Sequence, residues 1–158
     1  MAKSVKIYVV DTCSFTTLHK IYPKVVFPGV WEKVDELIES ERLISVDEVY
    51  HEISRQDDAL AKWAKTKKEM FIPLTEEVQD AAKDIVNKFV KLLDFKKNKS
   101  GADPFLIGLA QIRDGAIVVT EEKYSGGPDK HKIPDICDAM KIPHMNFLAM
   151  IKSEGLKL

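Results

Sequence analysis

Two short apolar runs in this chain, Ile7–Val10 and Ala116–Val119, are both followed closely by acidic residues. Asp11 comes directly after the first run, and the pair Glu121–Glu122 follows the second after a single residue. Runs of this length and composition predict buried parallel strands. Ligands of open α/β sheets bind beyond the carboxyl ends of the strands, where acids from neighbouring strands would converge. Crowded carboxylates repel one another unless a cation lies among them. The pattern therefore predicts a divalent metal site.

The remaining sequence alternates between short strands and amphipathic helices. The clearest helix is expected from Glu76 to Leu93, where apolar residues recur at helical spacing at Val78, Ala82, Ile85, Phe89 and Leu92. Further short strands are expected at Leu43–Ile44, Phe71–Ile72 and Ile142–Met145. This alternation predicts an α/β fold with a parallel core. The length of 158 residues is typical of one domain, here residues 1–158.

Composition limits the classes of partner and compartment. The formal net charge of −1 provides no global attraction to nucleic acid or membrane, so local basic patches and bound metal would have to hold a polyanion. The two cysteines form no CxxC pair, which suits a reducing cytosol. The N-terminal residues are too few and too polar for a signal peptide, and no stretch approaches the roughly 20 apolar residues of a membrane span. We expect a cytoplasmic protein without membrane contact.

A helix near Val46–Arg55 contributes a further acidic candidate. Ser45 followed by Glu48 three residues later is typical of a capping box, so Ser45 is the expected N-cap. Because Glu48 then has a structural task, Glu52 is the functional candidate on this helix. It lies one turn further along on the same side as Glu48.

Other acids have structural explanations that compete with a functional one. Asp11 could be a strand-end turn residue or the N-cap of the following helix. Asp103 before Pro104 is a suitable N-cap pair. Asp135 after Pro134 would favour a helix N-terminus through the helix dipole. At the level of sequence, the structural and the functional interpretation of each acid both stay open.

Five segments, taken in order, resemble motifs of PIN-domain nucleases. Val9–Phe15 resembles the family's opening, in which an Asp after the first strand precedes a Thr and a small hydroxyl residue. Tyr50–Ile53 is similar to the glutamate motif on an early helix, and Ala102–Ile107 to the motif in which an Asp opens a helix. Val118–Glu122 resembles the strand–Thr–x–acid motif. Lys132–Cys137 resembles an acidic element of a PIN-like branch whose members often look like toxins of toxin–antitoxin pairs.

The chain departs from the family's pattern at two places. Cys13 stands where a Ser is more usual, and the Glu121–Glu122 pair replaces the commoner Asp. A longer acidic arm would shift the metal position or hold the metal through water. The choice between Glu121 and Glu122 stays open.

The resemblance implies a three-layer α/β/α fold with a central mainly parallel sheet and Mg²⁺- or Mn²⁺-dependent hydrolysis of RNA phosphodiester bonds. Carboxylates without His or Cys suit these hard ions better than zinc. The implied catalytic residues are Asp11, Glu52, Asp103 and Glu122. The implied metal ligands are Asp11, Asp103, Glu121, Glu122 and Asp135. We expect Thr120 and Ser14 to hydrogen-bond and orient the acids.

Basic loop residues are the candidate RNA contacts. They lie shortly before Asp103 and Asp135 in the sequence and comprise Lys97, Lys99, Lys130 and Lys132. The competing explanation is that these lysines are solvated loop charges.

The resemblance also implies partners. It suggests the toxin of a toxin–antitoxin pair, restrained by a small antitoxin with a helix-turn-helix domain, and it allows a homodimer. The alternative is a non-catalytic PIN-like module that binds RNA or protein and has a degenerate metal site. A DNA-directed nuclease would use the same acids. A phosphatase with Asp11 as nucleophile is disfavoured, because the haloacid-dehalogenase signature needs a second Asp where Cys13 stands.

Overall fold

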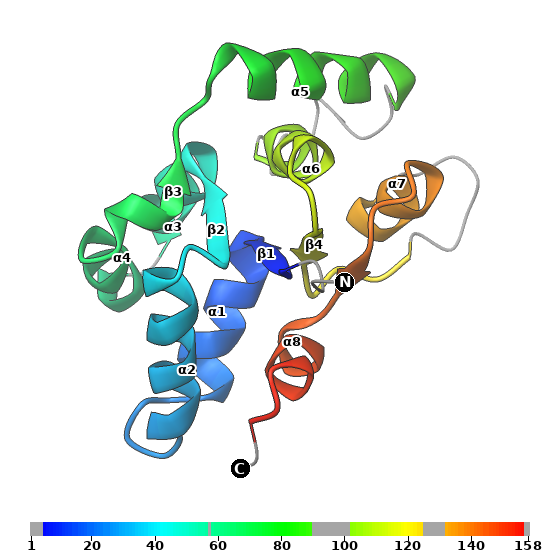
Figure 1. Cartoon of the computed structure of the whole chain (residues 1–158). Coiled ribbons are helices and arrows are strands. Elements are labelled where there is room, and N and C mark those ends of the chain that lie inside the picture. Colours follow the sequence, from blue (N-terminus) through cyan, green and yellow to red (C-terminus); the bar gives the residue numbers. More distant parts are fainter. Residues whose placement is uncertain (1–4, 57, 90–101, 125–131, 157–158) are drawn as a thin grey trace.

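The computed structural model describes residues 5–56, 58–89, 102–124 and 132–156 (Figure 1). The elements follow along the chain in the order β1 (Ile7–Val10), α1 (Thr12–Ile21), α2 (Pro28–Glu39), β2 (Leu43–Val46), α3 (Asp47–Gln56), α4 (Asp58–Lys65), the 3₁₀ turn η1 (Lys68–Met70), β3 (Phe71–Ile72), α5 (Glu76–Lys88), α6 (Asp103–Ile112), β4 (Ala116–Val119), α7 (Ile133–Ala139), β5 (His144–Met145) and α8 (Phe147–Ser153). None of the helices in these ranges has the length and apolar character needed to cross a membrane.

The five strands form one sheet in the order β3-β2-β1-β4-β5. All four neighbouring pairs are parallel, and β1 matches β4 residue for residue from Ile7 opposite Ala116 to Val10 opposite Val119. The chain thus builds outward from β1 to β3 and then returns across β1 to β4. This reversal creates a crevice beyond the carboxyl ends of β1 and β4, where ligands of such sheets bind. The predicted mainly parallel sheet is confirmed.

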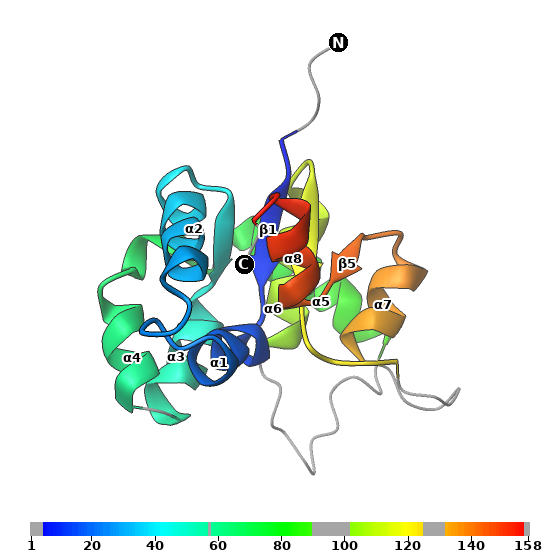
Figure 2. The same ribbon diagram turned by 90° about the horizontal axis from the view of Figure 1, so that it is seen from below.

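Helices cover both faces of this sheet. Helix α6 lies against one face with α5 outside it, while α1, α2 and α8 lie on the other face (Figures 1 and 2). Because α6 is enclosed by the sheet and by α5, its apolar residues are buried almost all round. Gly108 permits this close approach, since a Cβ there would lie 3.1 Å from the backbone nitrogen of Ala82 on α5. The predicted three-layer α/β/α fold is confirmed.

Helix starts follow the expected capping chemistry at two places. The Thr75 hydroxyl accepts from the backbone N–H of Val78 at the start of α5, and the side chain of Asn146 accepts from that of Ala149 at the start of α8. Helix α5 ends at Lys88 with Phe89 as its C-cap. The rest of the helix expected as far as Leu93 lies outside the described residues.

The predicted capping box at Ser45 is wrong. Ser45 is a fully buried residue of β2, and its hydroxyl donates to the carbonyl of Val10 on β1 at 2.6 Å. Helix α3 begins only at Asp47. A buried hydroxyl needs a partner, and the neighbouring strand supplies one, so the tertiary contact overrides the local capping signal.

Candidate metal centre

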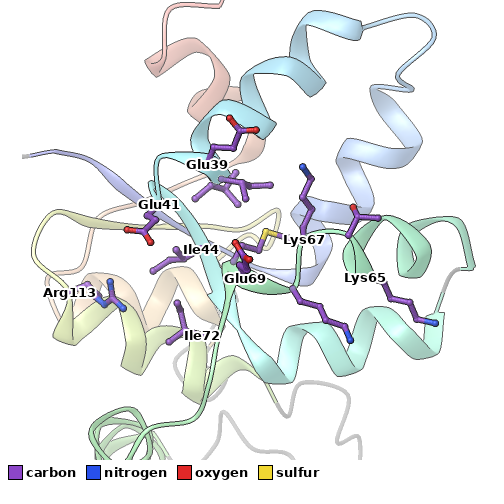
Figure 3. A pocket seen from close by; sticks show the side chains of 13 residues that line it. Glu39, Glu41, Ile44, Lys65, Lys67, Glu69, Ile72 and Arg113 are labelled. Atoms are coloured by element: carbon purple, nitrogen blue, oxygen red, sulfur yellow. The ribbon is translucent and has the colours of Figure 1, made fainter.

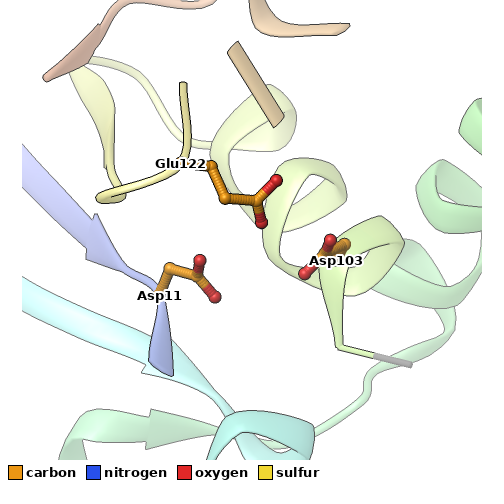
Figure 4. Close-up of side chains that lie close together, drawn as sticks. All are labelled: Asp11, Asp103 and Glu122. Carbon is orange, nitrogen blue, oxygen red and sulfur yellow. The ribbon is translucent and has the colours of Figure 1, made fainter. Parts of the chain in front are cut away.

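Three carboxylates from distant parts of the chain meet in the crevice beside β1 and β4. One oxygen each of Asp11, Asp103 and Glu122 lies within 4.8 Å of the other two, and the side chains point toward one another (Figure 4). Asp11 follows β1, Asp103 begins α6, and Glu122 comes shortly after β4. Asp11 and Asp103 are each only 5% exposed, and Glu122 is partly buried. We call these three residues the acidic triad.

Hydrogen bonds hold Asp11 in one orientation. Its Oδ1 accepts from the backbone N–H of Thr12 at 2.8 Å and thereby caps α1. Its Oδ2 accepts from the Thr120 hydroxyl at 3.0 Å and from the Cys13 thiol at 3.1 Å. Asp11 therefore caps α1 and also lies in the acidic triad, so the two interpretations of this residue are compatible.

Thr120 and Cys13 also connect the end of β4 to the start of α1. The backbone N–H of Glu122 donates to the Thr120 hydroxyl at 3.1 Å, and that of Glu121 donates to the Cys13 sulfur at 3.2 Å. Burial, followed by the charge of Asp11, raises the pKa of the Cys13 thiol well above its ordinary range. Cys13 is therefore a protonated donor to Asp11. The sequence pattern showed only that Cys13 departs from the resembled motif, in which a Ser is more usual, and did not predict this donor role.

Asp103 enters the triad from the first turn of α6. Ala102 is the N-cap of this helix, and Pro104 follows Asp103 within the first turn, so the predicted Asp103 N-cap is displaced by one residue. A carboxylate at this position is favoured by the partial positive charge of the helix N-terminus.

Glu52 on α3 is a fourth acid at the edge of the triad. Its Oε2 accepts a long hydrogen bond of 3.5 Å from the Thr12 hydroxyl, next to Asp11. Burial and then the negative charge of Asp11 raise the pKa of Glu52 to about 7, against an opposing effect of Arg55. Glu52 is thus an acid that changes protonation state near neutral pH.

Glu121 is engaged away from the triad. Its Oε2 accepts from the Ser14 hydroxyl at 2.8 Å and from the backbone N–H of Phe147, the first residue of α8, at 3.0 Å. Glu122 therefore reaches the triad, whereas the Glu121 carboxylate is held by other partners. Ser14 consequently orients Glu121 and not a member of the triad.

Asp135 and Lys132 lie beside the triad without joining it. The Asp135 carboxylate accepts from the backbone N–H of Lys132 at 3.0 Å and stabilises the start of α7, as the structural interpretation predicted. Asp135 nevertheless raises the pKa of Glu122, whereas Lys132 lowers it. Both side chains are therefore close enough to act on the site electrostatically. The other candidate RNA contacts, Lys97, Lys99 and Lys130, lie outside the described residues.

The electrostatics of the triad fit a bound cation. Burial raises the pKa of Asp11 and, together with the charge of Asp11, that of Glu122. Hard divalent cations bind oxygen at about 2.0–2.6 Å, so two oxygens on the same ion lie at most about 4–5 Å apart. The three carboxylate oxygens of the triad lie within 4.8 Å of one another, which is compatible with a shared ion. The triad could therefore hold a divalent metal ion, whose charge would offset the repulsion.

Elsewhere in the molecule, a cavity of about 550 Å³ is lined by charged residues that do not form such a cluster (Figure 3). Its wall mixes cations and acids from the end of α2, the segment between α4 and β3, and the end of α6: Glu39, Glu41, Lys65, Lys67, Glu69 and Arg113. Lys67 is paired with Asp35 at 3.1 Å. Within the described ranges, the acids of this wall do not converge as the triad does. The triad is the better candidate for chemistry.

Comparison with known proteins places the chain without assigning a function. The DUF4411 family, described as a domain of unknown function, matches residues 8–158. No curated protein matches the sequence.

Proposed function

The chain belongs to the DUF4411 family, and we propose that it is a metal-dependent endoribonuclease that hydrolyses RNA phosphodiester bonds. The observation that carries this proposal is the acidic triad at the carboxyl ends of β1 and β4. The order of the acidic motifs supports it, because it resembles that of PIN-domain nucleases.

Asp11, Asp103 and Glu122 would hold a Mg²⁺ or Mn²⁺ ion, since both prefer oxygen ligands. When bound, such an ion lowers the pKa of a coordinated water and neutralises charge on the phosphoryl oxygens. Thr120 and Cys13 keep Asp11 turned toward the site through their hydrogen bonds to Oδ2. Lys132 beside Glu122 supplies positive charge for the phosphate.

Glu52 is the candidate general base. It is half-buried beside Asp11, and its pKa of about 7 matches the requirement that a base be poised near the working pH. In the hydrolysis, a water oxygen bonds to phosphorus and the ester P–O bond breaks. Glu52 takes a proton from the water, and the leaving oxygen takes one from solvent.

The biological role follows from the same resemblance. We propose that the protein acts in the cytoplasm as the toxin of a toxin–antitoxin pair. A small antitoxin with a helix-turn-helix domain would restrain it, and the nuclease could act as a homodimer. The resemblance of Lys132–Cys137 to the acidic element of the toxin-like branch supports this assignment.

The test is cleavage of end-labelled single-stranded RNA by the purified full-length chain, with Mg²⁺, Mn²⁺ or EDTA. We expect metal-dependent cleavage that Asp103→Asn abolishes. Asp114→Asn is the matched control, because Asp114 is exposed and lies just beyond the opposite end of α6. Circular dichroism would establish that both variants are folded.

One result would refute the proposed site, and another would overturn the nuclease proposal itself. Full metal-dependent activity in Asp103→Asn would remove Asp103 from the catalytic set. RNA binding by the wild type without cleavage in either metal would favour a non-catalytic binding module. Competition between RNA and single-stranded DNA of the same sequence identifies the preferred nucleic acid.

A further inference from the structure

A cavity of about 450 Å³ adjoins the acidic triad on the side of β5. Its lining includes Glu122 of the triad, together with Lys123, Tyr124, His144 and Asn146. The volume lies within the range of about 300–1,000 Å³ typical of small-molecule sites. Because Glu122 belongs to the triad and also lines the cavity, a group bound in the cavity would lie next to this member of the triad.

An exposed aromatic side chain forms part of this wall. Tyr124 is 57% exposed, which is unusual for a large aromatic residue of a small domain. Its hydroxyl donates to Oδ2 of Asp138 at 2.6 Å. The ring of His144 lies edge-on to it, with centroids 5.9 Å apart, and Nε2 of His144 lies 2.9 Å from Oδ1 of Asp138. Asp138 on α7 thus fixes both rings, so Tyr124 is an exposed ring held in one orientation.

We propose that this cavity is a base-binding subsite, in which one unpaired nucleobase of the substrate strand stacks on Tyr124 while the adjoining phosphate lies at the triad. The inference rests on the proposed nuclease function and specifies a single-stranded segment as the substrate. Proteins that recognise unpaired bases stack them on aromatic rings. A ring that is already fixed loses little conformational entropy on binding, which favours affinity.

The charges around the cavity support a nucleotide as its occupant. Lys123 lines the cavity beside Glu121 and Glu122, and Lys132 acts electrostatically on Glu122. The Glu121 carboxylate is already bound by the Ser14 hydroxyl and the Phe147 N–H. Lysines beside a stacking ring can contact the phosphates that flank the base. The triad would lie at the phosphate to be cleaved, the lysines would contact the flanking phosphates, and the Tyr124 ring would stack on the base. The site thus offers one contact for each part of a nucleotide.

The test measures cleavage of a short single-stranded RNA in which one nucleotide at a time is made abasic around the cut site. At one position, loss of the base should raise the KM of the wild type about ten- to hundred-fold, with a smaller effect on kcat. Tyr124→Ala should raise KM by a similar factor, and the abasic substitution at that position should then have no further effect. Tyr124→Phe keeps the ring but loses the hydrogen bond to Asp138, so its KM should lie between those of the wild type and Tyr124→Ala.

A second measurement separates this inference from the nuclease proposal. A set of short RNAs, each with 2-aminopurine at a different position, should include one that loses fluorescence on binding to the wild type, because stacking quenches this base. The quenching should be absent with Tyr124→Ala, and it requires no cleavage. If the wild type cleaves RNA but Tyr124→Ala changes neither KM nor quenching, the subsite is refuted and the nuclease stands. Quenching that depends on Tyr124 in a chain without cleavage supports the subsite and refutes the nuclease.

Discussion

Thr120 is the residue at which loss of one hydroxyl should disturb the candidate site most directly. It is 3% exposed; its hydroxyl donates to Oδ2 of Asp11 at 3.0 Å and accepts from the backbone N–H of Glu122 at 3.1 Å. Thr120→Val preserves the shape of the side chain and removes these two hydrogen bonds, together with the longer contact of 3.4 Å with the Cys13 sulfur. Thr120→Ser keeps the hydroxyl and loses only a methyl group.

The expected destabilisation follows from these two bonds. A hydrogen bond to a charged group contributes about 1.5–3 kcal/mol to stability, and the N–H left without its acceptor adds to the loss. We therefore expect Thr120→Val to lower the free energy of unfolding by roughly 2–3 kcal/mol. For a domain of this size, each kcal/mol corresponds to about 2–4 °C, so Tm should fall by roughly 4–12 °C.

The loss should depend on pH with a defined sign. Burial raises the pKa of Asp11, and the hydrogen bonds from Cys13, Thr120 and the Thr12 N–H oppose this. Without the Thr120 donor, the ionised form of Asp11 is less stable, whereas the protonated form is less affected. The destabilisation should therefore be larger at pH 8 than at pH 5.

The assay is thermal unfolding followed by circular dichroism in EDTA at pH 5 and pH 8. The wild type, Thr120→Val and Thr120→Ser are compared. A Thr120→Val protein with the Tm of the wild type at pH 8 would refute the argument. So would a Thr120→Ser protein that is as unstable as Thr120→Val, because the methyl group would then be responsible.

Two further predictions test the electrostatics and the packing. Because the pKa of Glu52 is raised from its ordinary 4.5 to about 7, its protonated form favours the folded state, and this stability is lost as pH rises through 7. At pH 8 Glu52 is ionised and a cation would offset its charge, so Mg²⁺ or Mn²⁺ should raise Tm more at pH 8 than at pH 6 in differential scanning fluorimetry. Glu52→Gln should reduce the difference between the two shifts. Equal shifts of Tm at both pH values would contradict the raised pKa of Glu52. Gly108→Ala would place a Cβ 3.1 Å from the backbone nitrogen of Ala82 and should cost about 1–3 kcal/mol in urea unfolding, whereas at Gly29 the nearest atom is 4.0 Å away. If Gly108→Ala is no less stable than Gly29→Ala, the close contact between α5 and α6 is wrong.

The sequence was most informative where local pattern and topology agree. The apolar runs Ile7–Val10 and Ala116–Val119 both became buried strands, since runs of that kind satisfy a sheet that is covered on both faces. Their pairing in one parallel sheet follows from the strand order and brings the residues after them together. The sequence therefore predicts that Asp11 and the Glu121–Glu122 pair lie at one site, without deciding between the two glutamates.

The predictions were wrong or incomplete where the hydrogen-bond partner of a side chain is distant in the sequence. The Ser45 hydroxyl bonds to β1 and not to the start of a helix, because β2 lies next to β1. Glu121 and Glu122 are adjacent residues of the same type, so the local sequence does not distinguish them. The hydrogen bond from the Phe147 N–H at the start of α8 to Glu121 leaves Glu122 as the member of the triad. The hydrogen bond between Tyr124 and Asp138 could not be predicted from local sequence, because it joins a loop residue to a residue of the short helix α7.

Asp11 shows why a capping role alone does not account for an acid at this position. Asn and Ser cap helices about as well as Asp, and neither carries a charge that burial would disfavour. Asp11 accepts from Thr12, Thr120 and Cys13, while a carboxylate offers about four lone-pair sites. With these three donors, one site on Oδ1 remains, which suffices for a single bond to a cation. A buried carboxylate with that arrangement, beside two others, could bind a metal ion and cap a helix at the same time.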